Sequence, residues 1–160
     1  MEKKPLPIAE DEPDRKLLSD IARVGWHLVA VQEDDDGPPY VFSVGLYHSF
    51  DQPEIMIIGL DQETAGRLVN NVGKLMQAGS DFHAKHVNNE IADGFPMGFR
   101  AVEKEYYGEY LGYALWFYES FEFPVLQMLW PDKQSRFPWN DNCEETCRSV
   151  QRLEIIAGRQ

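Results

Sequence analysis

The sequence predicts an α+β domain with a mostly antiparallel sheet or a half-open (split) barrel and two or three packing helices. Strand-like and helix-like segments interleave, and the early strands follow one another through hairpins rather than long crossovers. The chain of 160 residues is 43% hydrophobic and 12% aromatic, which is enough for one core of ordinary domain size. We therefore expect a single α+β domain over residues 13–160, after a flexible lead-in over residues 1–12 that is rich in proline and charge.

Hydrophobic spacing predicts two helices in the first half of the chain. The first covers about residues 13–24 and ends at Gly25. The second covers residues 62–78, where Leu68, Val72 and Leu75 fall on the face expected to pack on the sheet. The other elements expected in this half are strands over 26–33, 40–46 and 55–58, and a loop over 48–53.

The second half of the chain is less regular. Short strands are expected near 91–95 and 98–102, around a turn at Pro96-Met97-Gly98. Tyrosines at helical spacing predict a helix over 105–118, with a strand as the alternative. The remaining expected elements are a strand over 125–130 and one short helix after residue 144.

The charge balance argues against several classes of partner. Lys and Arg number 15 against 27 Asp and Glu, a net charge of −12, whereas nucleic acids and anionic membranes need clustered positive charge. No apolar run approaches the roughly 20 residues of a transmembrane helix, and the first residues lack the apolar core of a signal peptide. We therefore expect a cytoplasmic protein that binds neither nucleic acid nor membrane.

No complete catalytic or metal-binding motif is present in the sequence. The pairs His83/His86 and Cys143/Cys147 supply zinc-ligand residue types, but their spacing is not that of a finger or ribbon. His48 near Asp51 is a general-base candidate without an accompanying nucleophile motif, and the glycines form no phosphate loop. We expect no metal site and assign no catalytic residue.

The aromatic segment 130–139 is the best candidate for a binding wall. The candidate ligand-binding residues are Tyr47, His48, Trp130, Asp132, Phe137 and Trp139. Prolines stiffen the segment, so it loses little entropy when its large rings are ordered for a ligand, and we expect Tyr47 and His48 to face it across a concavity. Asp132 would pair with Arg136 or with a ligand cation. The alternative is a structural segment in which both tryptophans are buried and Asp132 caps backbone N–H groups.

A set of short motifs rich in Gly, Pro and Trp extends over about residues 14–140. They are Gly25-Trp26-His27, residues 39–46, residues 52–55, Gly59-Leu60, residues 123–127, Trp130-Pro131-Asp132 and Phe137-Pro138-Trp139. Together they resemble the bacterial domain-of-unknown-function family 4262. This chain has Val-Phe-Ser-Val-Gly-Leu where Tyr-Thr-Val-Gly-Leu is expected, and Gln52 where His is usual. The resemblance implies one domain and names no activity.

A second likeness covers residues 28–82. A strand ending in Ser-Val-Gly-Leu, a loop, a Pro-Glu-Ile-Met-Ile-Ile strand and a long helix are similar to the opening of flavin-reductase-like split barrels, which hold flavin mononucleotide (FMN). No phosphate-binding cluster accompanies this order, and Arg67 and Lys74 lie two helical turns apart. We therefore expect no cofactor, with FMN as the alternative that this likeness implies.

Two functions remain open from the sequence. Acidity and the missing catalytic constellation favour a non-catalytic binding protein that neutralises a basic protein partner, as immunity proteins do. The alternative is a split-barrel-like protein that binds flavin or another small ligand, or an oxidoreductase.

Overall fold

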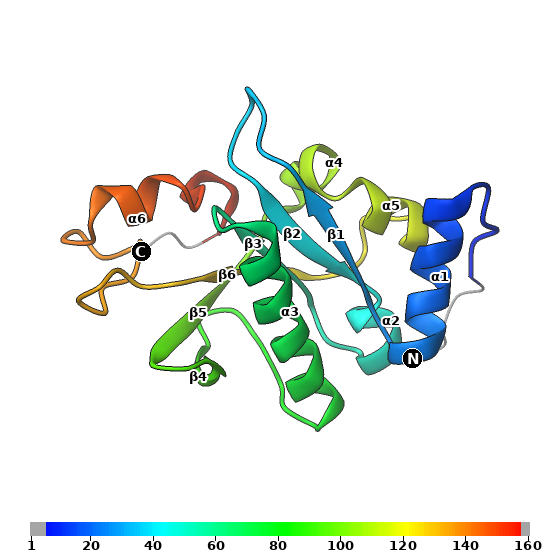
Figure 1. Cartoon of the computed structure of the whole chain (residues 1–160), viewed down its shortest axis with the longest axis horizontal. Coiled ribbons are helices and arrows are strands. Elements are labelled where there is room, and N and C mark those ends of the chain that lie inside the picture. Colours follow the sequence, from blue (N-terminus) through cyan, green and yellow to red (C-terminus); the bar gives the residue numbers. More distant parts are fainter. Residues whose placement is uncertain (1–5, 158–160) are drawn as a thin grey trace.

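Six strands form one open, mostly antiparallel sheet in the computed structural model, which describes residues 6–157 (Figure 1). They are β1 (His27–Val31), β2 (Tyr40–Val44), β3 (Glu54–Ile58), β4 (Val87–Ala92), β5 (Phe95–Ala101) and β6 (Val125–Leu129). Their order is β1-β2-β3-β6-β5-β4, and only β3 and β6 are parallel neighbours. The predicted α+β class is confirmed, in the form of an open sheet.

The described residues contain more helices than the two or three expected. The helices are α1 (Glu12–Val24), α2 (Leu46–Phe50), α3 (Gln62–Gln77), α4 (Tyr107–Tyr110), α5 (Gly112–Tyr118) and α6 (Glu145–Ser149), with 3-10 turns at Lys104–Tyr106 and Leu153–Ile155. The single helix expected over 105–118 is broken at Leu111, which has φ −120° and ψ 43°. The extra helices are thus short turns that hydrophobic periodicity cannot resolve.

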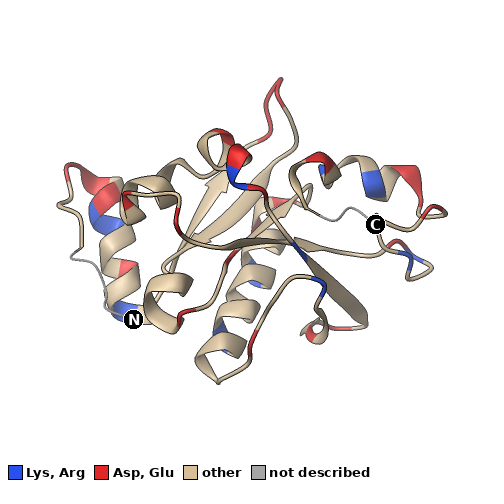
Figure 2. Cartoon of the chain, turned by 180° about the vertical axis from the view of Figure 1, so that it is seen from behind, with Lys and Arg blue, Asp and Glu red and all other residues tan. Residues whose placement is uncertain are grey.

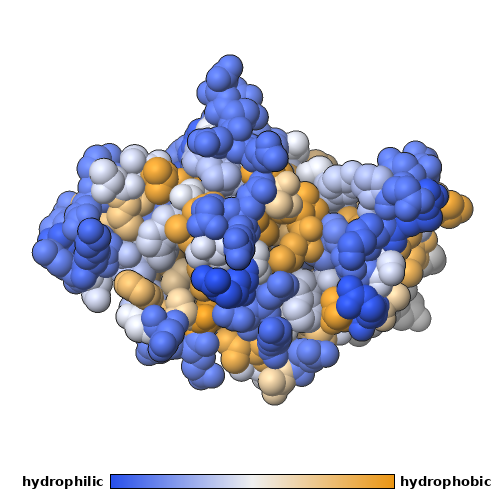
Figure 3. Space-filling model, viewed as in Figure 1, coloured by the Kyte–Doolittle hydropathy of each residue, from blue (hydrophilic) through white to orange (hydrophobic). Residues whose placement is uncertain are grey.

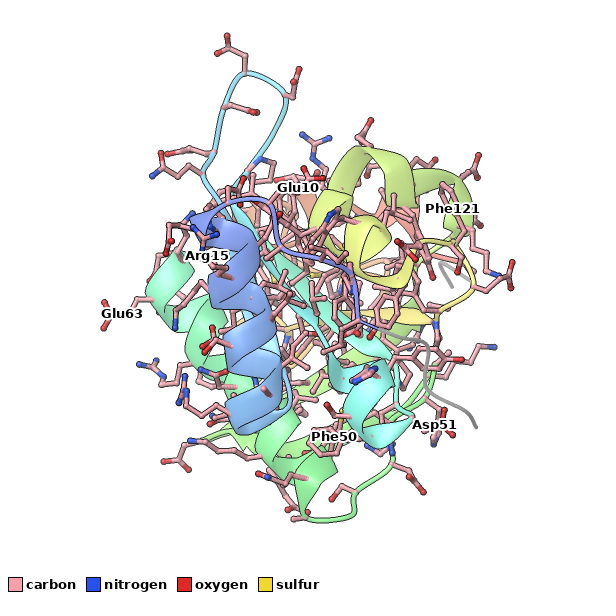
Figure 4. All side chains as sticks on the ribbon, turned by 90° about the vertical axis from the view of Figure 1, so that its right-hand side faces the viewer. Glu10, Arg15, Phe50, Asp51, Glu63 and Phe121 are labelled. Carbon is pink, nitrogen blue, oxygen red and sulfur yellow. The ribbon has the colours of Figure 1, made fainter. Side chains whose placement is uncertain are left out.

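The two faces of the sheet have separate hydrophobic layers. One face carries Ile55 and Ile57 and packs on α3, as predicted for the apolar side of that helix. The opposite face carries Met56 and Ile58 and packs on α1, α4 and α5. Figure 4 shows this arrangement from the side, with α3 and the α4–α5 pair on opposite sides of the strands.

The sequence of α3 explains its position. Asp61 caps it by accepting a hydrogen bond of 3.0 Å from the Thr64 N–H. The predicted Leu68 and Val72 are buried, whereas Leu75 lies at the margin and Met76 takes its place in the core. Other buried positions of the helix are Ala65, Val69 and Gly73.

Two local predictions are wrong. The turn between β4 and β5 lies at Asp93 and Gly94, where Gly94 adopts φ 83°, and not at Pro96-Met97-Gly98, which lies within β5. A loop is expected over residues 48–53, but α2 extends to Phe50, since the carboxylate of Glu54 accepts hydrogen bonds from the N–H groups that begin this helix.

The N-terminal lead-in is described only in part. Residues 1–5 of the expected lead-in lie outside the described residues, and α1 begins at Glu12 after its N-cap Asp11. Within residues 6–157, no helix combines the length and the apolar character needed to cross a membrane.

Candidate functional site

A cavity of about 840 Å³ lies between the N-terminal half of α3, the β4–β5 hairpin and the end of β6. We call it the α3–hairpin cavity. Its main apolar residues are Leu60, Leu68, Phe95, Met97, Trp130 and Pro131. Figure 3 shows apolar surface beside the hydrophilic outer face of α3 on this side of the molecule. The volume lies within the range of small-molecule sites, which are usually apolar with a few placed polar groups.

One face of α3 supplies the first wall. Thr64, Leu68 and Asn71 line the cavity together with Arg67, at a spacing that places them on successive turns of one helical side. Leu68 is buried at the floor, while Arg67 is exposed at the rim. The Asn71 amide donates a hydrogen bond of 3.0 Å to the carbonyl of Ile91, which ties this wall to β4.

The β4–β5 hairpin supplies the second wall. The pairing of β4 with β5 is irregular between Asn88 and Ala92, so the edge strand bends at the cavity. Phe95 follows the turn and is 53% exposed although it lines the cavity. A large ring left this accessible beside an apolar hollow is what a ligand site requires.

Trp130 supplies the third wall. It continues the alternation of β6, so it lies on the same face of the sheet as Leu126 and Met128. One buried amide fixes its backbone: Gln151 Oε1 accepts from the Trp130 N–H at 3.1 Å, and Gln151 Nε2 donates to its carbonyl at 3.0 Å. These hydrogen bonds fix the backbone of Trp130 at the point where the residue lines the cavity.

The charged groups at the rim are unpaired. Arg67 lies on the α3 side, and Glu90 and Asp93 lie on the hairpin side. Within residues 6–157, none of the three takes part in an ion pair. Their charges are available to a ligand that enters between them.

The structure places Phe137 and Trp139 on the opposite face of the sheet from Trp130. Their rings stack at a centroid distance of 4.5 Å and an angle of 3°, and the guanidinium of Arg100 lies 3.7 Å from the Trp139 ring centroid. Gly98 of β5 makes room for them, since a Cβ there would lie 2.5 Å from the Trp139 ring. These two aromatic residues cover β5 and do not share a wall with Trp130.

Asp132 organises the turn that separates the two tryptophans. Its carboxylate, 5% exposed as a residue, accepts hydrogen bonds from the N–H groups of Gln134, Arg136 and Glu144 and from Arg136 Nε at 2.9 to 3.0 Å. Burial raises the pKa of Asp132, but these hydrogen bonds outweigh it and hold the pKa well below the usual value. Asp132 thus pairs with Arg136, as expected, and also caps backbone groups, as in the structural alternative.

Tyr47 and His48 lie on α2, against α5. The Tyr47 ring meets Tyr118 edge-on at 5.8 Å, and His48 meets Phe117 edge-on at 5.5 Å. Neither residue lines the α3–hairpin cavity. Of the six candidate residues, only Trp130 does.

The carboxylate that positions α2 is Glu54, which the sequence analysis did not single out. Glu54 is 1% exposed and accepts hydrogen bonds from Ser43 Oγ at 2.7 Å, the Gly45 N–H at 2.9 Å and the Tyr118 hydroxyl. Burial raises its pKa, while the hydrogen bonds from Tyr118 and Ser43 act in the opposite direction. The signal in the sequence was the co-occurrence of Ser43 and Gly45 on one strand with a glutamate opening the next.

These segments, including the α3–hairpin cavity and the Asp132 turn, lie in the part of the chain that a known family model covers. The model of a domain of unknown function (DUF4262) matches residues 20–144. The chain belongs to the DUF4262 family. No curated protein and no solved structure matches it. The match ends before Gln151, so the residue that fixes Trp130 in this DUF4262 protein lies outside the matched region.

The zinc-ligand residue types of the DUF4262 protein lie in two separate places. The rings of His83 and His86 are 5.0 Å apart in the segment before β4. Cys143 lies just before α6, and Cys147 lies within it. Burial raises the pKa of both thiols, that of Cys147 to about 12, so they stay protonated. Within residues 6–157, no group of three or more His, Cys, Asp or Glu could hold a metal ion.

The charges that line the α3–hairpin cavity can be compared with those of a flavin. Its lining includes a single cation, Arg67, and two carboxylates, those of Glu90 and Asp93. A phosphate of FMN would meet one favourable and two unfavourable charges there. This charge pattern suits a ligand with fewer negative charges than FMN.

Proposed function

We propose that this DUF4262 protein is a binding protein that takes up a small amphipathic molecule in the α3–hairpin cavity. The observation that carries the proposal is a hollow of about 840 Å³ whose apolar floor meets charged residues at its rim. An apolar floor provides affinity, and rim charges select the orientation of the ligand.

The walls suggest the chemistry of the ligand. Trp130 and Phe95 offer aromatic surface to a flat apolar body. Arg67 offers a planar fork of donors to a single anionic group. Glu90 and Asp93 then favour donors, such as an amine or hydroxyl, on the opposite side of the ligand.

A fluorescent probe with an aromatic body and one sulfonate, anilinonaphthalene sulfonate, tests this proposal. We expect saturable binding at one site per chain, and a loss of affinity of about fivefold in Phe95→Ala, because a partly exposed aromatic contact is removed. The matched control is Phe121→Ala. Phe121 is 49% exposed, close to the value for Phe95, and lies on the loop after α5 (Figure 4). Equal affinities of the two variants would contradict the proposal.

A basic protein partner is a second candidate function. The loop between β1 and β2 stands out from the body of the molecule and carries acidic residues (Figure 2), namely Asp34, Asp35 and Asp36. Asp34 and Asp36 line a smaller cavity together with Glu109 and one cation, Arg152. Exposed charge of one sign speeds the encounter with a partner of the opposite sign. This loop would be the contact surface for such a partner.

An oligolysine peptide tests the second candidate by fluorescence anisotropy at low salt. Replacing Asp34, Asp35 and Asp36 by Asn should weaken binding more than replacing three other exposed acids by Gln. The control acids are Glu12, Glu63 and Glu145. Equal losses would show that binding follows net charge alone.

A further inference from the structure

A second cavity, of about 590 Å³, lies between the second half of α1, the start of β1 and α3. We call it the α1–α3 groove. The groove is lined by three cations, Lys16, Arg23 and Lys74, and by one carboxylate, Asp20. Its local charge is therefore positive, whereas the whole chain has a net charge of −12. A local excess of cations in an acidic protein favours an anionic ligand at this place.

Asp20 contacts two of these three cations and a histidine. Its Oδ1 accepts from Lys16 Nζ at 2.8 Å and from Arg23 Nη2 at 2.9 Å, and its Oδ2 lies 2.7 Å from His27 Nδ1. Burial raises the pKa of Asp20, but the hydrogen bonds from Lys16, His27 and Arg23 lower it to about 2. Asp20 is therefore an ionised acceptor, and the proton of a neutral His27 ring must lie on Nδ1.

This tautomer leaves His27 Nε2 as an acceptor. His27 lines the groove, and within residues 6–157 its Nε2 makes no hydrogen bond. A carboxylate that orients an imidazole through Nδ1 leaves Nε2 poised for a ligand hydrogen.

Asn70 adds a donor by the same reasoning. The indole N–H of Trp26 donates to Asn70 Oδ1 at 2.9 Å, and because an indole only donates, the amide orientation is fixed. Asn70 Nδ2 is then a donor on a residue that lines the groove, beside Lys74.

We propose that the α1–α3 groove binds hydrogen phosphate. The groove offers cationic and amide donors together with His27 Nε2, an acceptor that makes no hydrogen bond within residues 6–157. Hydrogen phosphate matches both kinds of group, because it carries anionic oxygens and also a hydroxyl that can donate to Nε2. Carboxylate and sulfate ions match only the donors, since neither carries a proton near neutral pH.

The test compares inorganic phosphate with sulfate at about pH 8, where both ions are dianions and only phosphate carries a hydroxyl that can donate to His27 Nε2. Binding is followed by the backbone amide NMR shifts of His27, Asn70 and Lys74. We expect phosphate to bind about fivefold more tightly than sulfate, the size of one hydrogen bond. Equal affinity of the two ions, or shifts spread over the whole surface, would overturn the proposal.

Two variants separate the contribution of charge from that of the histidine. Lys74→Gln should weaken both ions about threefold and keep the preference, because an exposed charge contact is lost. His27→Phe should abolish the preference for phosphate, and its persistence would contradict the role of Nε2. Lys104→Gln is the control, since Lys104 pairs with Glu122 and does not line the groove. If His27→Phe does not fold, the preference of the wild-type protein for phosphate over sulfate and the affinities of Lys74→Gln for both ions still test the proposal.

Discussion

Trp130 and Trp139 belong to one short aromatic segment, yet they lie on opposite faces of the sheet and have different surroundings. Trp130 extends β6 on the α3 side and lines a cavity. Trp139 stacks between Phe137 and the guanidinium of Arg100 on the other side, above Gly98. Aromatic residues close in sequence can thus divide into a cavity wall and a structural cover.

The turn at Asp132 causes this division. Strand alternation alone places Trp130 on the face of Leu126 and Met128. After Pro131, the hydrogen bonds that Asp132 accepts reverse the chain and return it over β5. We therefore expect variants on the two sides of Asp132 to affect different properties, ligand binding before it and stability after it.

The largest effect on stability is expected at the structural tryptophan. Trp139→Ala removes the stacking on Phe137 and the contact with Arg100, and should lower the free energy of unfolding by about 3 kcal/mol in urea titrations. Its affinity for anilinonaphthalene sulfonate should stay at the wild-type value. A loss of stability below about 0.5 kcal/mol would mean that the ring does not act as a cover.

The next largest effect on stability is expected where Gly98 leaves room for the Trp139 ring. Gly98→Ala places a Cβ 2.5 Å from the ring and should cost about 2 kcal/mol, since the overpacked ring must shift. The control is Gly108→Ala in α4, where a Cβ would meet nothing within 4 Å. We expect that control to be neutral or slightly stabilising, because alanine favours helix over glycine. Equal destabilisation of both variants would count against the close packing at Gly98.

The ligand wall should respond in binding rather than in folding. Trp130→Ala should lower the affinity for anilinonaphthalene sulfonate about tenfold, or about 1.4 kcal/mol, because an aromatic wall of the cavity is lost. The measurement is a fluorescence titration on protein shown to be folded by circular dichroism. Unchanged affinity would remove Trp130 from the site.

The smallest effect concerns the pH dependence that Asp132 contributes. Its folded-state pKa lies below the usual 3.8, so its stabilising contribution is present above that value and is lost as the pH falls towards the folded-state pKa. The difference in unfolding free energy between wild type and Asp132→Asn should therefore shrink below about pH 4. A difference in unfolding free energy that stays constant down to pH 3 would contradict a lowered pKa of Asp132 in the folded state.

The sequence predicted the elements in which hydrophobic residues recur at a regular spacing. Leu68 and Val72 fell on the correct face of α3, because a long amphipathic helix gives many consistent positions. The helix broken at Leu111 and the short α2 were missed, since the first depends on one unusual backbone conformation and the second on Glu54, a residue that follows it.

For the candidate site, the sequence could point to single residues by their type but not to the contacts between distant segments. Trp130 is one of the candidate ligand-binding residues and lines a cavity, but that cavity is formed with α3 and the β4–β5 hairpin, which are distant from it in sequence. Asp20 and His27 were not connected, because their pairing depends on how α1 turns into β1 at Gly25. Contacts of this kind arise from tertiary packing and produce no periodic pattern in the local sequence.

The indole N–H signals in a heteronuclear NMR spectrum test the central claim most directly. The chain has four tryptophans, and single Trp→Phe variants assign their signals. On titration with anilinonaphthalene sulfonate, we predict that the Trp130 signal shifts progressively to saturation while the Trp139 signal stays in place. A shift of Trp139 with Trp130 unmoved would contradict the assignment of the ligand site to the α3–hairpin cavity.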